Sequence, residues 1–576
     1  MKQIILILMS ALVIQAFQGH ACTSYLVTKG ASADGSTMIS YAGDSHIRYG
    51  QIYFFPRAQW PEGSMVTIYD RSSNRPLGQI PQPAETYQVT GFMNEHQVAI
   101  GESTFGGRRE LRDTTGKIDW GSIIFLTLQR AKTAREAIQV MAELLDAYGY
   151  YSSGQSYSIA DPNEVWIMEI IGKGVDMQVE RRTRRTYNAN RGAVWVAKRI
   201  PDGYISAHAN HARITQFPLE NGTTSISSKS FERIHDPVVE VVYAHDVISF
   251  ARSQGFFSGD DADFSFTAAY APLDFGSARF CELRVWTMFQ EAAGGMEPYW
   301  EYATGYSPGP AMPLWVKPKE KLTPRDLMRF KRNTLEGTPL DMSKDIGAGP
   351  HGLPYRWRPL YFEYEGKRYF HERATATQQT AFSWVAQMRS WLPNPIGGIF
   401  WYGLDDTGLT LHAPFYSGML SVPYNYQRGH GDILTYSENA AFWVFNRVSH
   451  FIYLFYDRAI VDVRKMQEEL ESRFEAYIPA IDAGALILYE QDPMLAKQFL
   501  TEFSHNTANN LLEQWKELGN FLLVKYLDGN IKHEKDGVFL RNPWDFPLAP
   551  MHPEYPDSWK RSLIEETGDK FLVPTQ

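Results

Sequence analysis

Two cysteines, Cys22 and Cys281, are the strongest nucleophiles that this sequence offers. A thiol attacks a carbonyl carbon efficiently only as the thiolate, so it needs a nearby base or a positive charge. If the mature chain began at Cys22, a free α-amine with a pKa of about 7.7–8.0 would lie on the same residue as the thiol. That amine can take the thiol proton and later return it to a leaving amine. These groups indicate acyl transfer by one N-terminal cysteine.

The first 21 residues suggest why the mature chain would begin at that cysteine. Lys2 precedes an apolar stretch over 4–14, and a short polar segment ends in the small residue Ala21. This is the pattern of a secretory signal peptide, and its apolar part is shorter than the roughly 20 residues that a membrane span needs. We therefore expect cleavage after Ala21, export to the periplasm or the extracellular space, and no transmembrane span. The two cysteines provide no disulfide framework for an exported chain.

Three interpretations of Cys22 remain open at this point. It could be the lipidated first residue of a bacterial lipoprotein, although Gly19 occupies the place where that signal has a branched apolar residue. It could be an N-terminal nucleophile with a free thiol and a free amine. It could also be a buried structural cysteine that happens to lie near the start of the chain.

The composition is that of a folded protein of considerable size. The 576 residues are 44% hydrophobic and 14% aromatic, with a formal net charge of −9. The basic run at 181–185 is short and is expected in a solvated loop, so nucleic acid is not an expected partner. We find no cysteine and histidine spacing typical of a zinc site and no glycine-rich phosphate loop. The sequence therefore predicts neither a metal nor a cofactor.

The elements that would position Cys22 are mainly β-strands. Residues 23–28 and 36–41 alternate in polarity around a turn at Asp34-Gly35, which predicts neighbouring strands with Cys22 at the open end of the first. Thr133 and Glu136 form a capping box ahead of a helix that Gly149 ends. Strands are also predicted over 51–56, 86–92, 96–104, 156–160, 165–171, 193–200, 204–210 and parts of 355–412. Residues 122–131 are predicted to be helical or buried. Helices are predicted over 236–255 and 280–292, from Thr323-Pro324, and over most of the chain beyond 437.

Strands followed by two helices and more strands favour an α+β class with a sheet-on-sheet core between helices. Because strands return after residue 355, we expect residues 22–470 to form one continuous core. Residues 471–576 are predicted to be a helical C-terminal extension.

Several polar residues interrupt the predicted strands and could help Cys22. A hydrolase of amides needs donors for an oxyanion and a group that orients the amine. Taken singly, such residues are more often turns, caps or surface positions. The candidates are Asp44, Asn94, Glu102, Ser103, Thr104, Asn210 and Arg279.

The order of seven longer segments resembles a known family. From Cys22 to about residue 470 the chain is similar to the secreted PepD-like cysteine dipeptidases, which are N-terminal-nucleophile hydrolases. Compared with any single motif, these segments in this order are far more specific. They are residues 21–46, 91–107, 148–174, 194–215, 270–286, 330–342 and 347–359.

The resemblance implies a four-layer αββα fold and the hydrolysis of dipeptides. It implies that Cys22 is the nucleophile and its amine the base, that Asp44 holds the amine, and that Asn210 helps at the oxyanion. Arg279 would lie beside the thiol. The substrate and oxyanion region would include Glu102, Thr104 and Asn94.

One position departs from the family pattern. Many relatives have an arginine three residues before the residue that Asp44 matches, and Tyr41 stands there in this chain. His46, Arg48 and Arg279 are the candidates for the missing positive charge.

The sequence is compatible with three functions. The leading one is an exported cysteine exopeptidase that cleaves dipeptides, in which Glu102 would bind the free amine of the substrate. The second is an N-acyl amide hydrolase of the bile-salt or penicillin-V acylase type, whose pocket would lack that carboxylate. The third is a surface lipoprotein without catalysis. The sequence leaves open whether the protein forms a homo-oligomer.

Overall fold

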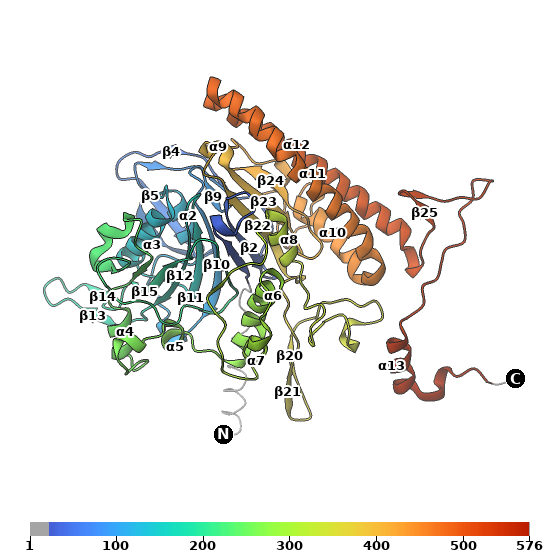
Figure 1. The fold of residues 1–576 in the computed structure, drawn as a ribbon, viewed down its shortest axis with the longest axis horizontal. Coiled ribbons are helices and arrows are strands. Elements are labelled where there is room, and N and C mark those ends of the chain that lie inside the picture. The colour runs from blue at the N-terminus through green and yellow to red at the C-terminus, as the bar shows by residue number, and fades with distance from the viewer. Residues whose placement is uncertain (1–21, 575–576) are drawn as a thin grey trace.

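The computed structural model describes residues 22–574, so the leader expected at 1–21 lies outside the described residues. Two large β-sheets form the centre of the molecule (Figure 1). The first has seven strands in the order β19-β16-β1-β2-β22-β23-β24, and every neighbouring pair is antiparallel. Its strands are β1 (Ser24–Val27), β2 (Thr37–Asp44), β16 (Ile205–His208), β19 (Trp315–Val316), β22 (Thr380–Met388), β23 (Gly398–Leu404) and β24 (Ala413–Tyr416).

The second sheet has nine strands in the order β17-β18-β15-β12-β11-β10-β9-β8-β3. Only its β17–β18 pair is parallel. Its strands are β3 (Phe54–Phe55), β8 (Val89–Thr90), β9 (Met93–Asn94), β10 (Ala99–Gly106), β11 (Gly154–Ala160), β12 (Val165–Gly172), β15 (Ala193–Arg199), β17 (Ser225–Ser227) and β18 (Val241–Tyr243).

The two sheets pack against each other through β1 and β2 on one side and β10 and β11 on the other. Every residue of β1, β2, β11, β12, β22 and β23 is buried, as expected for strands covered on both faces. Aromatic side chains fill the interface, where Trp384 contacts the rings of Tyr41, Phe92 and Phe400 at centroid distances of 5.3–5.8 Å.

Helices cover the outer faces of this pair of sheets. α2 (Ser122–Leu128), α3 (Ala134–Tyr148) and α4 (Val247–Ser253) pack on the nine-stranded sheet. α10 (Ala441–Leu454), α11 (Tyr456–Gln491) and α12 (Pro493–Lys525) pack on the seven-stranded sheet, on the opposite side of the molecule (Figure 1). The predicted α+β class is confirmed.

Local sequence signals located several elements correctly. Thr133 Oγ1 accepts a hydrogen bond from the Glu136 amide at 3.1 Å, and α3 begins and ends where the capping residues indicated. The hairpin β11–β12 and the strand pair β1–β2 also lie where they were predicted. The helix that Thr323 caps is α8 (Pro324–Phe330).

Two helix predictions need correction. Residues 236–255 are predicted to be helical, but they contain β18 over Val241–Tyr243, where β-branched valines favour a strand, and the helix α4 begins only at Val247. Residues 280–292 begin inside a π-helical segment, Ser277–Glu282, and only α6 (Leu283–Ala292) is α-helical.

The C-terminal region also differs from the expectation. The predicted division at residues 470 and 471 falls inside the continuous helix α11. The predicted helical extension is helical only as far as Lys525 and again in α13 (Asp557–Thr567). Between these helices lies the short hairpin of β25 (Glu534–Lys535) and β26 (Val538–Phe539). Among residues 22–574, none of the helices is long and apolar enough to cross a bilayer.

A buried ion pair ties α11 to the edge of the core. The Arg389 guanidinium, at the end of β22, pairs with Asp482 on α11 and donates to the carbonyl oxygen of Ile396 at 2.7 Å. Tyr416 on β24 donates to the same carboxylate at 2.8 Å. One aspartate therefore holds the helix against two strands.

We expect Asp482→Ala to lower the free energy of unfolding by about 3–5 kcal/mol, because it leaves the Arg389 charge buried without its partner. Glu469→Ala on the same helix is the matched control, since it breaks only the exposed pair with Arg473 and should change the value by less than about 0.5 kcal/mol. Chemical denaturation of both variants measures the difference. Equal unfolding midpoints would show that the pair does not hold α11.

Candidate active site

Cys22 lies buried directly before β1, between the two sheets. Its Sγ is 3.4 Å from the hydroxyl oxygen of Tyr41 on β2 and 3.6 Å from Oε1 of Glu102 on β10. The two contacts come from opposite sheets, so the packing of the sheets fixes the position of the sulfur.

A chain of polar groups leads from the sulfur to a buried arginine. Tyr41 donates to Glu102 Oε1 at 2.7 Å, and Arg48 Nη1 donates to the Tyr41 hydroxyl at 3.2 Å. The Arg48 guanidinium also lies 4.2 Å from the centroid of the Trp120 ring. Of the three cations proposed from the sequence, Arg48 is the one that reaches this group.

Burial and charge act on the thiol in opposite directions. Burial raises the pKa of Cys22 well above its usual value, and the Glu102 carboxylate raises it further. The positive charge of Arg48 lowers that pKa. Burial also raises the pKa of Glu102, against the lowering effect of Arg48. Glu102 Oε2 is buried and has no hydrogen-bond partner among the described residues.

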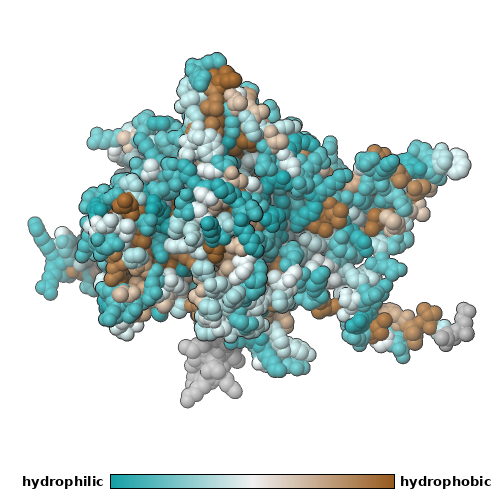
Figure 2. All heavy atoms as spheres, viewed as in Figure 1, coloured by the Kyte–Doolittle hydropathy of each residue, from teal (hydrophilic) through white to brown (hydrophobic). Residues whose placement is uncertain are grey.

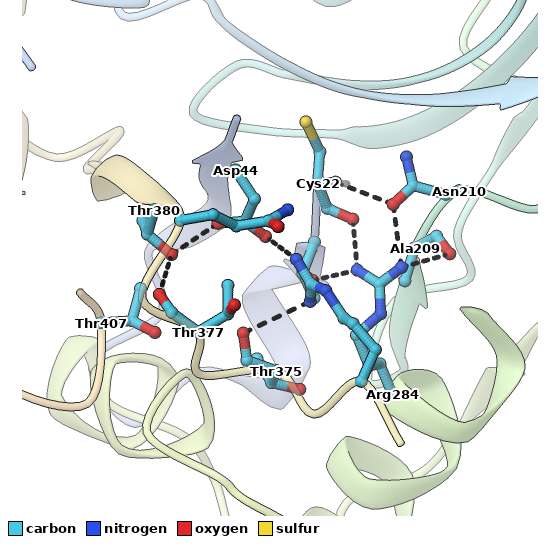
Figure 3. Close-up of polar contacts among 12 residues, drawn as sticks. Cys22, Asp44, Ala209, Asn210, Arg284, Thr375, Thr377, Thr380 and Thr407 are labelled. Atoms are coloured by element: carbon cyan, nitrogen blue, oxygen red, sulfur yellow. Dashed lines mark hydrogen bonds and ion pairs between the residues drawn. The ribbon is translucent and has the colours of Figure 1, made fainter. Parts of the chain in front are cut away.

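The backbone nitrogen of Cys22 has a partner of its own. It donates to Oδ1 of Asn210 at 2.7 Å. Arg284, on α6, donates to the same Oδ1 at 2.8 Å and to the carbonyl oxygen of Cys22 at 2.7 Å. Figure 3 shows the guanidinium on the backbone side of Cys22, while the sulfur points the other way. The nitrogen and the sulfur of one residue thus meet different groups.

Asn210 is held in an unusual conformation by its neighbours. Its φ of 61° is in the left-handed region, which asparagine adopts more readily than most residues. Its amide nitrogen donates to Ser103 Oγ at 3.2 Å, and its Nδ2 donates to the Thr104 carbonyl oxygen at 2.7 Å. Ser103 in turn shares a 2.6 Å hydrogen bond with Nδ1 of His208. Burial lowers the pKa of His208 to about 3, so this imidazole is neutral.

Asp44 lies at the end of β2, close to Cys22, but its carboxylate has other partners. It pairs with Arg373 and accepts a hydrogen bond from Thr380 Oγ1 at 2.6 Å. The buried Lys331 donates from Nζ to the Thr23 carbonyl oxygen at 3.2 Å, and burial lowers the pKa of its amine to about 7. In this structure the Cys22 nitrogen donates to Asn210, whereas the family resemblance implies that Asp44 holds that amine.

Two other candidates have partners away from the sulfur. Arg279 donates to the Thr304 carbonyl oxygen at 2.9 Å and pairs with Glu372 at 3.1 Å. Asn94 uses its amide hydrogens on the carbonyl oxygens of Leu128 and Ala131. Both residues are thus engaged in structural contacts.

Arg284 is the functional candidate that the sequence reasoning missed. It lies five residues after Arg279, and no residue pattern separates the two arginines. The π-helical segment that contains Arg279 ends before Arg284 and shifts the helical register, so spacing alone does not indicate which side chain faces Cys22. Cys281 is buried beside Phe280 and Leu360, and burial raises its pKa to about 11.

Comparison with curated proteins gives the class. A probable dipeptidase of Salmonella dublin is 22% identical over 419 residues, which cover 69% of this chain and 81% of the relative. A probable dipeptidase of Latilactobacillus sakei is 23% identical over 523 residues, covering 86% and 94%. A dipeptidase of Bifidobacterium longum is 22% identical over 443 residues, covering 70% and 72%. With the family match below, these relatives make the protein a cysteine-type hydrolase of peptide bonds.

The family model described as peptidase family C69 matches residues 21–469. The matched segment starts one residue before Cys22 and ends within α11. It covers most of the chain, so this protein belongs to peptidase family C69, and the predicted family is confirmed.

Charge substitutions around the sulfur should move its reactivity in opposite directions. We expect Arg48→Met to slow alkylation of Cys22 at neutral pH, because the charge that lowers the thiol pKa is lost. Glu102→Gln should accelerate alkylation, because a charge that raises the pKa is lost. The pH dependence of iodoacetamide labelling, located by peptide mass, measures both. Cys281 in the same samples is the internal control, and parallel changes at both cysteines would contradict the assignment.

Proposed function

We propose that this protein is an exported dipeptidase that hydrolyses dipeptides through an acyl-enzyme on Cys22, with the α-amine of that residue as the general base. The proposal includes an αββα N-terminal-nucleophile fold, in which the core begins at Cys22. One observation carries it most: the nitrogen and the sulfur of Cys22 are both buried, and each is held by a different polar group. The relatives named dipeptidase support the choice of substrate.

The reaction follows from these two atoms. The free amine takes the thiol proton, and the thiolate sulfur bonds to the carbonyl carbon of the dipeptide. When the C–N bond breaks, the ammonium of Cys22 gives its proton to the departing amino acid. The amine then takes a proton from a water molecule, whose oxygen attacks the thioester, and the thiol is restored as the second amino acid leaves.

Asn210 is proposed to contact both the amine of Cys22 and the oxyanion. Its Oδ1 orients the amine, and its Nδ2 stabilises the oxyanion, with Thr104 positioning the side chain. Arg284 fixes the amide of Asn210 from behind. Asp44 is proposed to balance the charge of the buried cations beside Cys22, and it can accept from the amine once the chain before Cys22 is gone.

Two residues proposed from the sequence, Arg279 and Asn94, are not assigned a contact with the reacting atoms. Arg279 is proposed to position the helix that carries Arg284, through its pair with Glu372. We leave Asn94 out of the oxyanion site because its amide hydrogens are engaged with Leu128 and Ala131.

Glu102 is proposed to bind the α-ammonium of the substrate. The nitrogen of an N-terminal residue lies two bonds from the carbonyl carbon under attack, so its binding group must lie within a few ångströms of the sulfur. Glu102 meets this condition at 3.6 Å and has a buried oxygen without a hydrogen-bond partner among the described residues. An acylase of N-acyl amides would place an apolar surface there, so this carboxylate favours the exopeptidase.

Export is part of the proposal and rests on the leader sequence. Release of residues 1–21 would turn the Cys22 amide into an amine, so the same cleavage would export and activate the protein. Lipidation of Cys22 would block both reacting atoms, and the intact mass of the mature protein distinguishes the two outcomes.

Dipeptide hydrolysis should depend on removal of the residues before Cys22. We expect the purified active protein to begin at Cys22, and Cys22→Ala to reduce dipeptide hydrolysis to the background rate. A variant that keeps one uncleavable residue before Cys22 should be inactive although folded, because its nitrogen is an amide and cannot take a proton. N-terminal sequencing, circular dichroism and a dipeptidase assay measure this. Full activity with the extra residue present would eliminate the amine as the base.

Recognition of the substrate amine should depend on Glu102. We expect Glu102→Gln to lower kcat/KM for free dipeptides by about 10–100-fold, the value of one charge-assisted hydrogen bond. Hydrolysis of the N-acetylated dipeptides should change much less. The ratio of the two kcat/KM values is the readout, because any change in thiol reactivity affects both substrates equally. An unchanged ratio in the variant would remove Glu102 from amine binding, and a wild-type preference for acetylated substrates would support the acylase.

A further inference from the structure

The last described part of the chain leaves the body of the molecule. Residues 530–574, called here the arm, run outward as an extended chain that contains the β25–β26 hairpin and α13 (Figure 1). No residue of α13 is buried. The arm therefore contributes almost nothing to the core of its own copy.

The arm nevertheless carries many large apolar side chains. Trp544 is 84% exposed and Phe546 is 70% exposed. Figure 2 shows hydrophobic residues on the same projecting part of the molecule. An extended segment that buries so little apolar surface does not offset the conformational entropy lost when its backbone is fixed. Clusters of exposed apolar side chains are typical of interaction sites. The side chains at least 38% exposed are Val538, Leu540, Trp544, Phe546, Leu548, Met551, Tyr555, Leu563, Ile564, Phe571, Leu572 and Val573.

The root of the arm is fixed to the helices of the body. Lys525 Nζ at the end of α12 pairs with Glu534 of the arm at 3.4 Å. The rings of Phe521 on α12 and Phe539 on β26 stack at a centroid distance of 5.3 Å. These contacts set the direction in which the arm leaves, so a partner would meet a partly preorganised segment.

The composition of the arm narrows the class of its partner. It has six lysines and arginines and eight aspartates and glutamates, so it has no basic excess to attract nucleic acid or an anionic membrane. Its exposed apolar side chains offer on the order of 1,000 Å² of surface. This exceeds the roughly 800 Å² that each partner contributes to a standard protein interface.

The same chain also carries an apolar surface that could receive an arm. Leu454 at the end of α10, Val461 near the start of α11 and Val524 at the end of α12 are exposed. The ends of these three helices meet, because Lys525 pairs with Asp462 at 2.9 Å and the rings of Phe455 and Tyr526 lie 5.5 Å apart. Each copy therefore supplies one arm and one receiving surface, and a two-fold exchange between two copies satisfies both and closes the assembly.

We propose that the arm docks on a second copy of this chain, across the exposed ends of α10, α11 and α12, and that the protein is a dimer built by reciprocal arm exchange. The docking is separate from catalysis, so its test needs no substrate.

Full-length mature protein is compared with the double variant Trp544→Ser/Phe546→Ser by sedimentation velocity over a range of concentrations. We expect wild-type dimers, or assemblies of dimers, and a dissociation constant raised about 30-fold or more in the variant, as for two central aromatic side chains. Leu434→Ser is the control, because Leu434 is equally exposed but lies on a loop of the body. Circular dichroism checks that all three proteins are folded.

A cross-linking experiment keeps the proposal testable if the double variant is unstable. Ala549→Cys introduces an exposed thiol in the arm, and Cys22→Ser and Cys281→Ser are introduced with it, so that the label can react only at residue 549. The new thiol is labelled with a benzophenone maleimide in a mixture of light and isotope-labelled copies. We expect cross-links between light and heavy copies at the ends of α10–α12. A wild-type monomer at every concentration, an unaltered dimer in the double variant, or cross-links within single copies would overturn the proposal.

Discussion

The site depends on one shared acceptor, Oδ1 of Asn210. It receives hydrogen bonds from the backbone nitrogen of Cys22 and from Arg284. Arg284 also donates to the carbonyl oxygen of Cys22, so both polar backbone atoms of this residue are held by the Asn210–Arg284 pair. The sheets supply the remaining constraint, because β2 and β10 bring a tyrosine and a glutamate to the sulfur from opposite sides.

The electrostatics follow from placing this residue between two sheets. Burial makes the thiolate costly, so a compensating charge has to come from nearby. The family resemblance implies an arginine at the position of Tyr41, and in this chain Arg48, seven residues further on, lowers the thiol pKa and donates to the Tyr41 hydroxyl. A neutral residue at position 41 is therefore compatible with a cation at the thiol.

The sequence located most of what depends on local patterns. The Thr133 N-cap, the β11–β12 hairpin, the α+β class and the family all follow from short-range chemistry or from motif order, whereas the Glu136 carboxylate accepts from the Lys132 nitrogen and does not complete the predicted capping box. The candidates Cys22, Glu102 and Asn210 meet in the structure because strand ends and turns carried visible polar interruptions.

What the sequence did not show depends on long-range packing or on helical register. Arg279 lies within a π-helical segment and Arg284 lies after it, and a 3.6-residue pattern read along the sequence does not reveal this change of register. Asp44 was assigned from resemblance, but its partner Arg373 lies 329 residues away in the chain. The predicted C-terminal helices extend too far, because the large apolar side chains beyond Lys525 are exposed and do not pack into the core.

The imidazole behind the site has a consequence for its behaviour in solution. His208 bridges Ser103 and Ser158, and its pKa of about 3 lies far below neutrality. Histidine is usually the side chain that changes charge as a solution moves from mildly acidic to neutral. Here that ring stays uncharged throughout, so the scaffold under Asn210 keeps its shape while the groups at the reacting centre gain or lose protons.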